Sequence, residues 1–427
     1  MSLNANVSRK MIVGWLFLAS AVLYLLGQAF GLSAYFSALC AWLGVMVFWP
    51  SLGGSAKRQT SILLLLGIAL LGWAWLAGAE LQWQLILTRN MPLLTMFVAV
   101  SFLSLANPPE QENQLLPKGR RGFWSTLFST HLLGAVINLS VVFVVSDRLK
   151  RNEKLTDAQL ALVMRSFCAA AFWSPFFVAT GVALTYAPGA HWQQVVVPGL
   201  LMVLPLVLIS FWDVYRSGFD KFEGYPVRRD SLLMPVLLAA SVLILHELLP
   251  KTPILLLISM LAPIGALIFM HQRPRLRALK NYVDEKQANV SSQFSLFLAA
   301  GVFSTGISTL ISCYPNLMQL QMDYFSPLLF LATSMGMILF ALVGVHPVVT
   351  VAIVSPFLLP LGANPNQLAF LFLSVWGIAT ASSPLSGVGL AMISRYQAEP
   401  KQILKLQWRY MLFMWLSSGL LNWWWFS

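Results

Sequence analysis

Two short segments place polar residues in a shared pattern inside apolar sequence. The first reads Gly-Ala-Val-Ile-Asn-Leu-Ser from Gly134, and the second reads Gly-Val-His-Pro-Val-Val-Thr from Gly344. In each segment a hydroxyl residue follows the glycine by six positions. Neutral oxygens and an imidazole could hold a cation, an anionic substrate or a proton. The candidate binding residues of these segments are Asn138, Ser140, His346 and Thr350.

A serine-proline pair follows each segment at nearly the same distance. Ser174 lies forty residues after Gly134, and Ser383 lies thirty-nine residues after Gly344. Proline removes an amide donor and releases a carbonyl, so a helix can unwind at such a pair. Unwound backbone at membrane depth is tolerated where it is buried in protein or lines a cavity. The candidate binding residues at these pairs are Ser174, Pro175, Ser382, Ser383 and Pro384. A simple proline kink is the alternative.

Two histidines accompany the segments: His131 precedes the first glycine, and His346 lies within the second segment. Such a pair could bind an anion when protonated or relay protons, whereas neutral histidines hydrogen-bonded to the backbone are the alternative. Neither segment and neither serine-proline pair contains Asp or Glu. This argues against carboxylate-centred proton exchange and favours an anionic substrate.

The composition defines the setting of these residues. Of 427 residues, 58% are apolar and 10% are charged, and the mean hydropathy is +0.73, which is typical of a membrane protein and excludes a soluble enzyme. The net charge of +12 comes from basic residues beside apolar runs, so it indicates membrane topology and not nucleic-acid binding. The three cysteines form no pattern for disulfides or a metal site.

Basic clusters mark the cytoplasmic ends of membrane spans. Run 123–146 has such clusters at both ends, which predicts a re-entrant hairpin opening inward, and the long run 325–361 has none, which predicts one opening outward. The predicted fold is therefore an all-α polytopic membrane protein with about eleven transmembrane helices and two opposed hairpins in an inverted repeat. The N-terminus is expected in the cytoplasm and the C-terminus in the periplasm.

The chain is accordingly divided into five expected segments. They are scaffold helices at 1–90, repeat 1 at 91–214 with a broken helix at 163–187, scaffold helices and basic loops at 215–292, repeat 2 at 293–400 with a broken helix at 367–391, and a final transmembrane helix at 401–427. Thr156 before Asp157 predicts the start of a helix leading into the first broken helix. Arg165 could clamp an anion at the cytoplasmic mouth, but an arginine that begins a span is usually an anchor at the membrane interface, and this interpretation is favoured. Asp213 is interpreted as an interfacial partner of Arg216.

This layout resembles the ion transporter superfamily, which includes divalent anion/sodium symporters and, more distantly, arsenite pumps and sodium/proton antiporters. Symporters of this kind carry Ser-Asn-Thr at each hairpin tip and a Thr-Pro or Pro-Pro-Asn type of break. The corresponding residues here are Asn138 and Ser140, then His346, Pro347 and Thr350, with breaks that read Trp-Ser-Pro and Ser-Ser-Pro. Neither tip carries a full Ser-Asn-Thr. The resemblance implies a homodimer in which hairpin-bearing transport domains move as elevators.

The expected function is secondary active transport of a small organic or inorganic anion, such as a dicarboxylate, across a bacterial inner membrane. The expected partners are this anion, the lipid bilayer and a second copy of the chain, with no nucleic acid. No cofactor and no metal site are expected, and the coupling ion is left open between Na⁺, H⁺ and none. The alternative is a membrane enzyme acting on a lipid-linked substrate, with catalytic residues in a surface loop such as 215–230.

Overall fold

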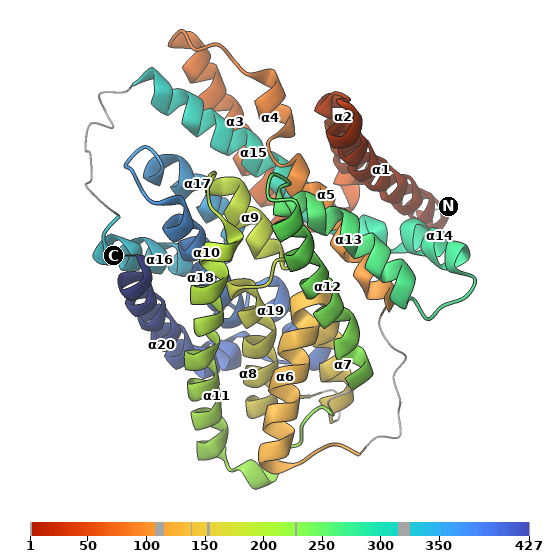
Figure 1. Cartoon of the computed structure of the whole chain (residues 1–427), viewed down its shortest axis with the longest axis vertical. Coiled ribbons are helices and arrows are strands. Elements are labelled where there is room, and N and C mark those ends of the chain that lie inside the picture. The colour runs from red at the N-terminus through yellow and green to blue at the C-terminus, as the bar shows by residue number, and fades with distance from the viewer. Residues whose placement is uncertain are drawn as a thin grey trace. The chain divides into compact units, whose positions relative to one another are not determined.

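The computed structural model describes residues 2–106, 115–137, 139–151, 154–226, 229–314 and 325–426. All regular structure in these ranges is helical, and the α-helices run from α1 to α20 (Figure 1). The predicted all-helical fold class is confirmed. The predicted site residue Asn138 lies outside the described residues.

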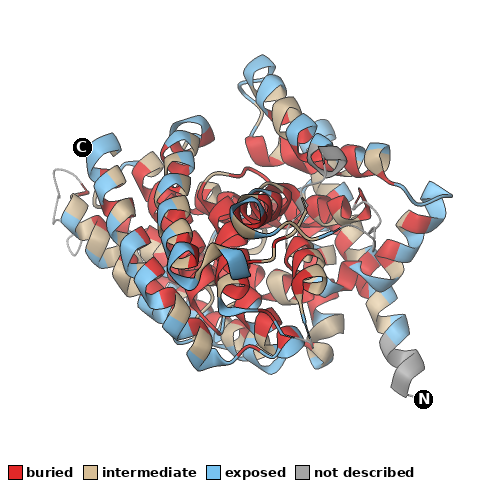
Figure 2. Cartoon of the chain, turned by 90° about the horizontal axis from the view of Figure 1, so that it is seen from below, coloured by how far each residue is buried: buried red, intermediate tan, exposed pale blue. Residues whose placement is uncertain are grey.

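Among the described residues, seven helical segments are long and apolar enough to cross a membrane: Val7–Phe30, Ala34–Ser51, Gly54–Leu76, Trp83–Ala106, Trp192–Ser217, Gln287–Cys313 and Pro365–Tyr396. Many helices bury one side and expose the other (Figure 2). On Gly54–Leu76 the exposed side carries large apolar residues, including Leu65 at 69% and Leu76 at 79% exposure. Such a surface is stable against lipid hydrocarbon and costly against water. The chain is a multi-pass membrane protein.

The chain forms two compact units, each assembled from separate stretches of sequence. Unit 1 comprises Met1–Asn107, Ser241–Asp323 and Ala352–Gly362, and unit 2 comprises Pro108–Ala240, Tyr324–Val351 and Ala363–Ser427. Helices α12 (Arg229–Leu248) and α17 (Pro347–Leu358) each contribute to both units. The five segments expected from the sequence stay a prediction.

Unit 1 is held together by close helix packing. Its remaining helices are α1 (Ser2–Phe30), α2 (Ala34–Phe48), α3 (Gly54–Leu76), α4 (Trp83–Thr88), α5 (Met91–Ser101), α13 (Ile254–Phe269), α14 (Arg275–Glu285) and α15 (Ser291–Cys313). Helices α3 and α15 approach closely at Gly67, which has no side chain. A Cβ added there would lie only 2.9 Å from the Phe303 Cα. Ser20 and Ser37 exchange hydrogen bonds between α1 and α2, each hydroxyl donating to the other residue's carbonyl at 2.9 and 2.7 Å. In lipid the hydrophobic effect does not drive helices together, so close packing at small residues and hydrogen bonds between hydroxyls hold these helices against each other.

Unit 2 contains two series of elements in the same order. The first is α6 (Gly119–Ile137), α7 (Ser140–Leu149), α8 (Asp157–Cys168), the 3₁₀ segment η3 (Ala169–Phe172) and α9 (Val178–Tyr186). The second is α16 (Pro327–Leu342), α17, α18 (Pro365–Ser382) and α19 (Gly387–Tyr396). Helices α10 (Trp192–Leu201), α11 (Val203–Ser217) and α20 (Pro400–Phe426) complete the unit. Each series is a pair of helices, at the position of a predicted hairpin, followed by an interrupted helix.

Local sequence explains where the interrupted helices begin. The Thr156 hydroxyl accepts from the Gln159 backbone N–H, and the Gln159 side chain accepts in return from the Thr156 N–H, which forms a capping box at the start of α8. Asn364 caps α18 with Pro365 in the first turn, where its missing N–H costs nothing. The predicted helix start after Thr156 is therefore present. Helix α18 is the central helix of unit 2, since it packs against α8, α9, α10, α16 and α20.

Candidate functional site

The first interrupted helix opens at the predicted serine-proline pair. Helix α8 ends at Cys168, η3 ends at Phe172 and α9 starts at Val178, so Ser174 and Pro175 lie in non-helical backbone. The Ser174 hydroxyl donates to the Ala135 carbonyl at 2.5 Å, near the end of the first hairpin helix, and accepts from the Phe176 N–H at 3.2 Å. The break in the helix is thereby fastened to the tip of the hairpin.

The second interrupted helix repeats this arrangement. Helix α18 ends at Ser382 and α19 starts at Gly387. The Ser383 hydroxyl donates to the Ala341 carbonyl at 2.8 Å, at the end of α16, and accepts from the Leu385 N–H at 3.2 Å. Both serines therefore make the same two contacts, one to the hairpin tip and one to the second residue after themselves. Local sequence alone predicts the second contact, and only the fold supplies the first.

His131 is held by two hydrogen bonds on α6. Its Nδ1 lies 3.0 Å from the Ser166 carbonyl, and its Nε2 lies 3.0 Å from the Trp173 indole nitrogen. A carbonyl can only accept and an indole N–H can only donate, so the imidazole is neutral, with its hydrogen on Nδ1. The side chain is buried, at 5% exposure. His131 thus makes the backbone hydrogen bond expected of a neutral histidine, and its role toward a proton or an anion stays a prediction.

His346 stands at the start of α17, in the turn between the two helices of the second hairpin. Its Nδ1 accepts from the Val348 N–H at 3.2 Å, so the hydrogen of the neutral ring is on Nε2. The preceding turn contains Gly344, whose φ of 94° is disfavoured for residues with a Cβ. Thr350 is buried one turn further on, and its hydroxyl donates to the Pro347 carbonyl at 2.9 Å. The second tip thus lies at the beginning of a helix.

The second tip and the second break lie against each other. A Cβ on Gly344 would lie 3.0 Å from the Leu385 side chain. Ser386 caps α19 by accepting from the Gly389 N–H at 3.0 Å, and its hydroxyl is 2.8 Å from both the Ser383 and Thr380 carbonyls. The positive ends of α17 and α19 therefore start beside one another. Helix N-termini are favourable places for an anion.

Several buried hydroxyls around the breaks have no hydrogen-bond partner among the described residues. They are Ser129, Thr130, Ser166 and Ser382. Of these only Ser382 was a predicted site residue; Ser129 and Thr130 are adjacent to His131 in sequence, which is the signal that would have suggested them. Hydroxyl oxygens of this kind can coordinate a small cation or water. The described residues contain no group of three or more His, Cys, Asp or Glu side chains suited to a metal ion.

The two series meet through their interrupted helices. The ring of Phe172, at the end of η3, covers Gly377 on α18, where an added Cβ would lie 2.4 Å from a ring atom. Phe172 is fully buried. The predicted site residues of both repeats that the structure describes all belong to unit 2: His131, Ser140, Ser174, Pro175, His346, Thr350, Ser382, Ser383 and Pro384.

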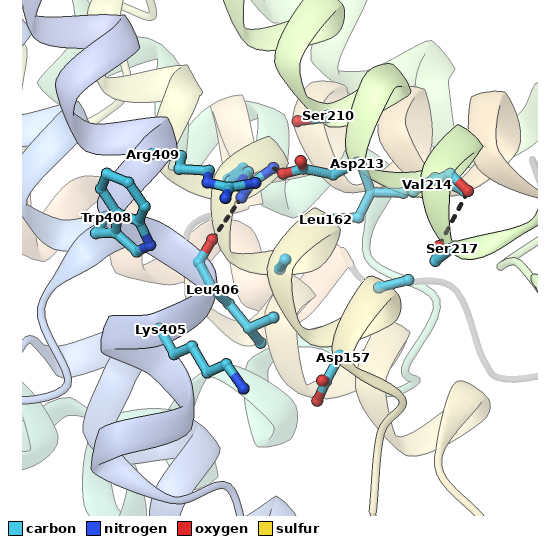
Figure 3. Close-up of a pocket in the computed structure, with 13 residues that line it drawn as sticks. Asp157, Leu162, Ser210, Asp213, Val214, Ser217, Lys405, Leu406, Trp408 and Arg409 are labelled. Carbon is cyan, nitrogen blue, oxygen red and sulfur yellow. Dashed lines mark hydrogen bonds and ion pairs between the residues drawn. The ribbon is translucent and has the colours of Figure 1, made fainter.

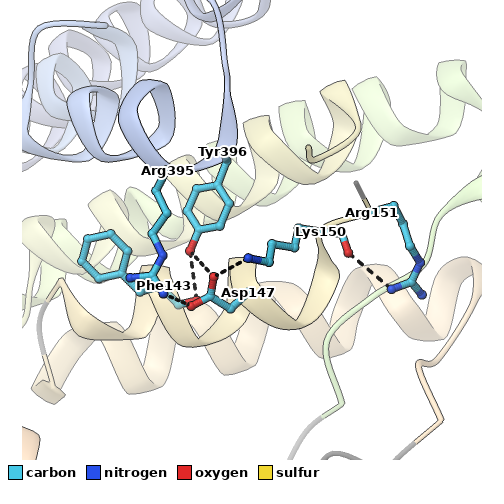
Figure 4. Close-up of polar contacts among 6 residues, drawn as sticks. All are labelled: Phe143, Asp147, Lys150, Arg151, Arg395 and Tyr396. Carbon is cyan, nitrogen blue, oxygen red and sulfur yellow. Dashed lines mark hydrogen bonds and ion pairs between the residues drawn. The ribbon is translucent and has the colours of Figure 1, made fainter. Parts of the chain in front are cut away.

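A polar cluster joins the end of α7 in the first series to the end of α19 in the second (Figure 4). The Asp147 carboxylate, near the end of α7, pairs with Arg395 near the end of α19 and accepts from the Tyr396 hydroxyl at 3.1 Å. Lys150 lies 3.5 Å from the same carboxylate, and the Arg395 guanidinium stacks over the Phe143 ring at 5.1 Å. This cluster ties the second helix of the first hairpin to the last helix of the second series. Nothing in the local sequence signals it.

Two sequence interpretations are wrong. Arg165 is no interfacial anchor: its side chain is 1% exposed and forms an ion pair with Asp213 at 2.7 Å. Asp213 consequently pairs with Arg165 and not with Arg216. The guanidinium also donates to the Gln407 side chain at 2.8 Å and to the Leu406 carbonyl at 2.9 Å. A buried charge requires such partners, and they come from helices far away in sequence.

No protein-family model and no curated protein sequence matches the chain. Among solved structures, the chain is similar to the YdaH transporter of Alcanivorax borkumensis, described as having an unusual topology, with 13% sequence identity and a TM-score of 0.54. The match covers 86% of this chain and 98% of that one. The chain therefore has a transporter-like helical membrane fold.

Proposed function

We propose that the protein is a secondary active transporter of the ion transporter superfamily and moves a small anion across a bacterial inner membrane. The observation that carries the proposal is the repeated fastening of a hairpin tip to a helix break, by Ser174 to Ala135 and by Ser383 to Ala341. Secondary transporters bind substrates at interrupted helices of this type. The transporter-like fold supports the same class.

The anionic substrate is inferred from the second tip and break. There the starts of α17 and α19 adjoin, His346 carries its hydrogen on Nε2, and no carboxylate occurs within residues 342–350 or 380–387. A cation would find no charged ligand in these segments, whereas an anion gains from both helix dipoles. We assign Ser382, Ser383, Pro384, His346 and Thr350 to this site.

The first repeat contributes neutral oxygens, and we assign Asn138, Ser140, Ser174, Pro175 and the neighbouring hydroxyls to binding of a coupling ion. Sodium suits neutral oxygens, and protons remain an alternative. Movement of the unit that carries both repeats, in a homodimer, provides alternating access. The two hairpins enter the membrane from opposite sides.

A thermal-stability screen of the purified protein tests the substrate class. The panel is succinate, citrate, sulfate and phosphate, each with sodium and with potassium. A specific ligand at about 100 times its dissociation constant adds about 2.7 kcal/mol to the folded state. A shift with one anion class that requires sodium is the expected result. Absence of any shift would contradict an anion site.

Labelling of single cysteines tests the hairpin topology. Cysteines at positions 118 and 150 flank the first hairpin, so a membrane-impermeant thiol reagent should reach both from the cytoplasmic face. Labelling from opposite faces would mean that this region crosses the membrane and would remove the first hairpin from the proposal.

A further inference from the structure

A cavity of about 380 Å³ lies in unit 2 among α8, α11 and α20 (Figure 3). It is separate from the tips and breaks assigned to transport. The charged and hydroxyl side chains that line it include Asp157, Arg165, Ser210, Asp213, Lys405 and Arg409. In Figure 3, Lys405 and Asp157 lie toward one end of the cavity, and Arg409, Asp213 and Ser210 lie toward the other.

Both carboxylates of the cavity are already engaged. Asp213 pairs with the buried guanidinium of Arg165 at 2.7 Å, and Asp157 accepts from the Gln402 side-chain amide at 2.6 Å. The Arg165 guanidinium is fixed further by Gln407, by the Leu406 carbonyl and by the Tyr410 ring, whose centroid is 4.8 Å away. Arg165 is thus a rigid positive group in the wall, neutralised by Asp213.

Two cations and one hydroxyl are left without comparable partners. Lys405 and Arg409 form no ion pair with any described carboxylate, and Arg409 only stacks on the neighbouring Trp408 ring at 5.2 Å. Ser210 is 1% exposed, lines the cavity, and its hydroxyl has no hydrogen-bond partner among the described residues. A buried hydroxyl without a partner is destabilising, so it points to a bound group that is polar. An anion with several oxygens would satisfy the hydroxyl and both cations.

The positions along the three helices indicate where this anion comes from. Asp157 starts α8, Ser217 ends α11 and Lys405 lies in the second turn of α20, so the N-terminal ends of α8 and α20 and the C-terminal end of α11 line one mouth of the cavity. Arg165 lies about 12 Å deeper along α8. Two tryptophans adjacent in sequence to the cavity residues Asp213 and Arg409, namely Trp212 and Trp408, are 55% and 49% exposed. Exposed tryptophans and basic pockets between membrane helices are typical of the headgroup region on the cytoplasmic side.

We propose that this cavity binds the phosphate group of an anionic phospholipid, with Arg409 and Lys405 as its ion partners and the Ser210 hydroxyl as a hydrogen-bond donor. The bound lipid bridges α8, α11 and α20. It therefore stabilises the helix that leads into the first break. The proposal concerns binding and does not depend on transport.

The test measures lipid binding by the purified full-length protein with native mass spectrometry. Dioleoyl phosphatidylglycerol is compared with dioleoyl phosphatidylcholine, which carries a phosphate but no net charge. The double variant is K405Q/R409Q. The matched control is K401Q, which removes a charge one turn earlier on α20, at a residue that does not line the cavity. We expect preferential retention of phosphatidylglycerol, weakened about tenfold in the double variant and unchanged in the control.

Two additions make the outcome unambiguous. Ser210→Ala leaves all charges in place and should weaken phosphatidylglycerol binding by a smaller factor, about threefold. Inorganic phosphate is added as a competitor: displacement at millimolar concentration would support the phosphate pocket but assign free phosphate as its ligand. Equal retention of both lipids, or retention of phosphatidylglycerol unaffected by the double variant, would overturn the proposal. Lys405 and Arg409 are exposed, so their variants should unfold at the wild-type temperature without lipid.

Discussion

The two repeats of unit 2 share their local geometry but differ in access. Phe176 and Leu385 occupy equivalent places, since each donates its N–H to the serine of its break, yet Phe176 is 1% exposed and Leu385 is 47% exposed. His131 is bonded to the Ser166 carbonyl and the Trp173 indole, and the His346 Nδ1 accepts from the Val348 N–H at the start of α17. We infer that the first repeat holds the coupling ion in closed surroundings and that the second repeat admits the anion.

The largest expected loss of stability comes from the contact between the two repeats, where Phe172 packs on Gly377. Gly377→Leu would force a side chain into the buried Phe172 ring, and overpacking of this kind costs about 3 kcal/mol or more where the core cannot move. We expect loss of monodisperse protein in size-exclusion chromatography. Gly336→Leu is the control, because a Cβ there meets nothing within 4 Å. Equal recovery of the two variants would mean that the repeats do not meet as described.

The two histidines should separate stability from ligand binding. His131→Ala leaves the Trp173 N–H and the Ser166 carbonyl without their partner, which should cost about 2 kcal/mol of folding free energy. His346→Asn keeps a side-chain oxygen for the helix cap and should cost less than about 0.5 kcal/mol. Thermal unfolding measures both. The anion-induced shift should survive in the first variant and vanish in the second, and the reverse pattern would invert the assignment of the repeats.

The two break serines sharpen the comparison. Ser174→Ala and Ser383→Ala each remove one hydrogen bond to a hairpin carbonyl, with an expected cost of about 1 kcal/mol. The loss should be greater at Ser174, where the break is buried and water cannot replace the hydroxyl. Ser417→Ala, at a half-buried serine on α20 whose hydroxyl donates to the Phe413 carbonyl of its own helix, provides the baseline in the same unfolding measurement. A greater loss at Ser383 would indicate that the second break is the sealed one.

The smallest expected effect lies at the Asp147 cluster. Arg395 is half exposed, so Asp147→Asn should cost about 0.5 kcal/mol, and the loss should shrink as salt screens the pair. Thermal unfolding at low and high ionic strength tests this. Asp220→Asn, an exposed aspartate of the same unit, should have no effect at either salt concentration. A loss independent of salt would mean that the cluster acts by packing and not by charge.

The sequence predicts those features that depend on neighbouring residues. Apolar runs indicate the helical membrane fold, Pro175 and Pro384 indicate where the helices are interrupted, and Thr156 indicates where α8 begins. Each of these follows from backbone chemistry within a few residues. The expected number of membrane spans and the hairpin orientation depend on the bilayer and stay predictions.

The sequence does not predict contacts between distant segments. Arg165 and Asp213 are 48 positions apart, and Asp147 and Arg395 are 248 apart, so no local pattern pairs them. Charge placement suggested Arg216 as the partner of Asp213 because the two are close in sequence. The pairing of His131 with Trp173 escapes notice for the same reason, since it depends on how α6 packs against α8.

The central claim is that the second tip and break bind a transported anion. Uptake into proteoliposomes tests it most directly, using as radiolabelled substrate the anion that stabilises the purified protein and an inward sodium gradient. Wild-type protein should accumulate the anion, and His346→Asn should reduce the initial rate at least about tenfold, equivalent to about 1.4 kcal/mol of lost interaction. Unchanged uptake by His346→Asn, or no uptake by the wild-type protein, would contradict the account.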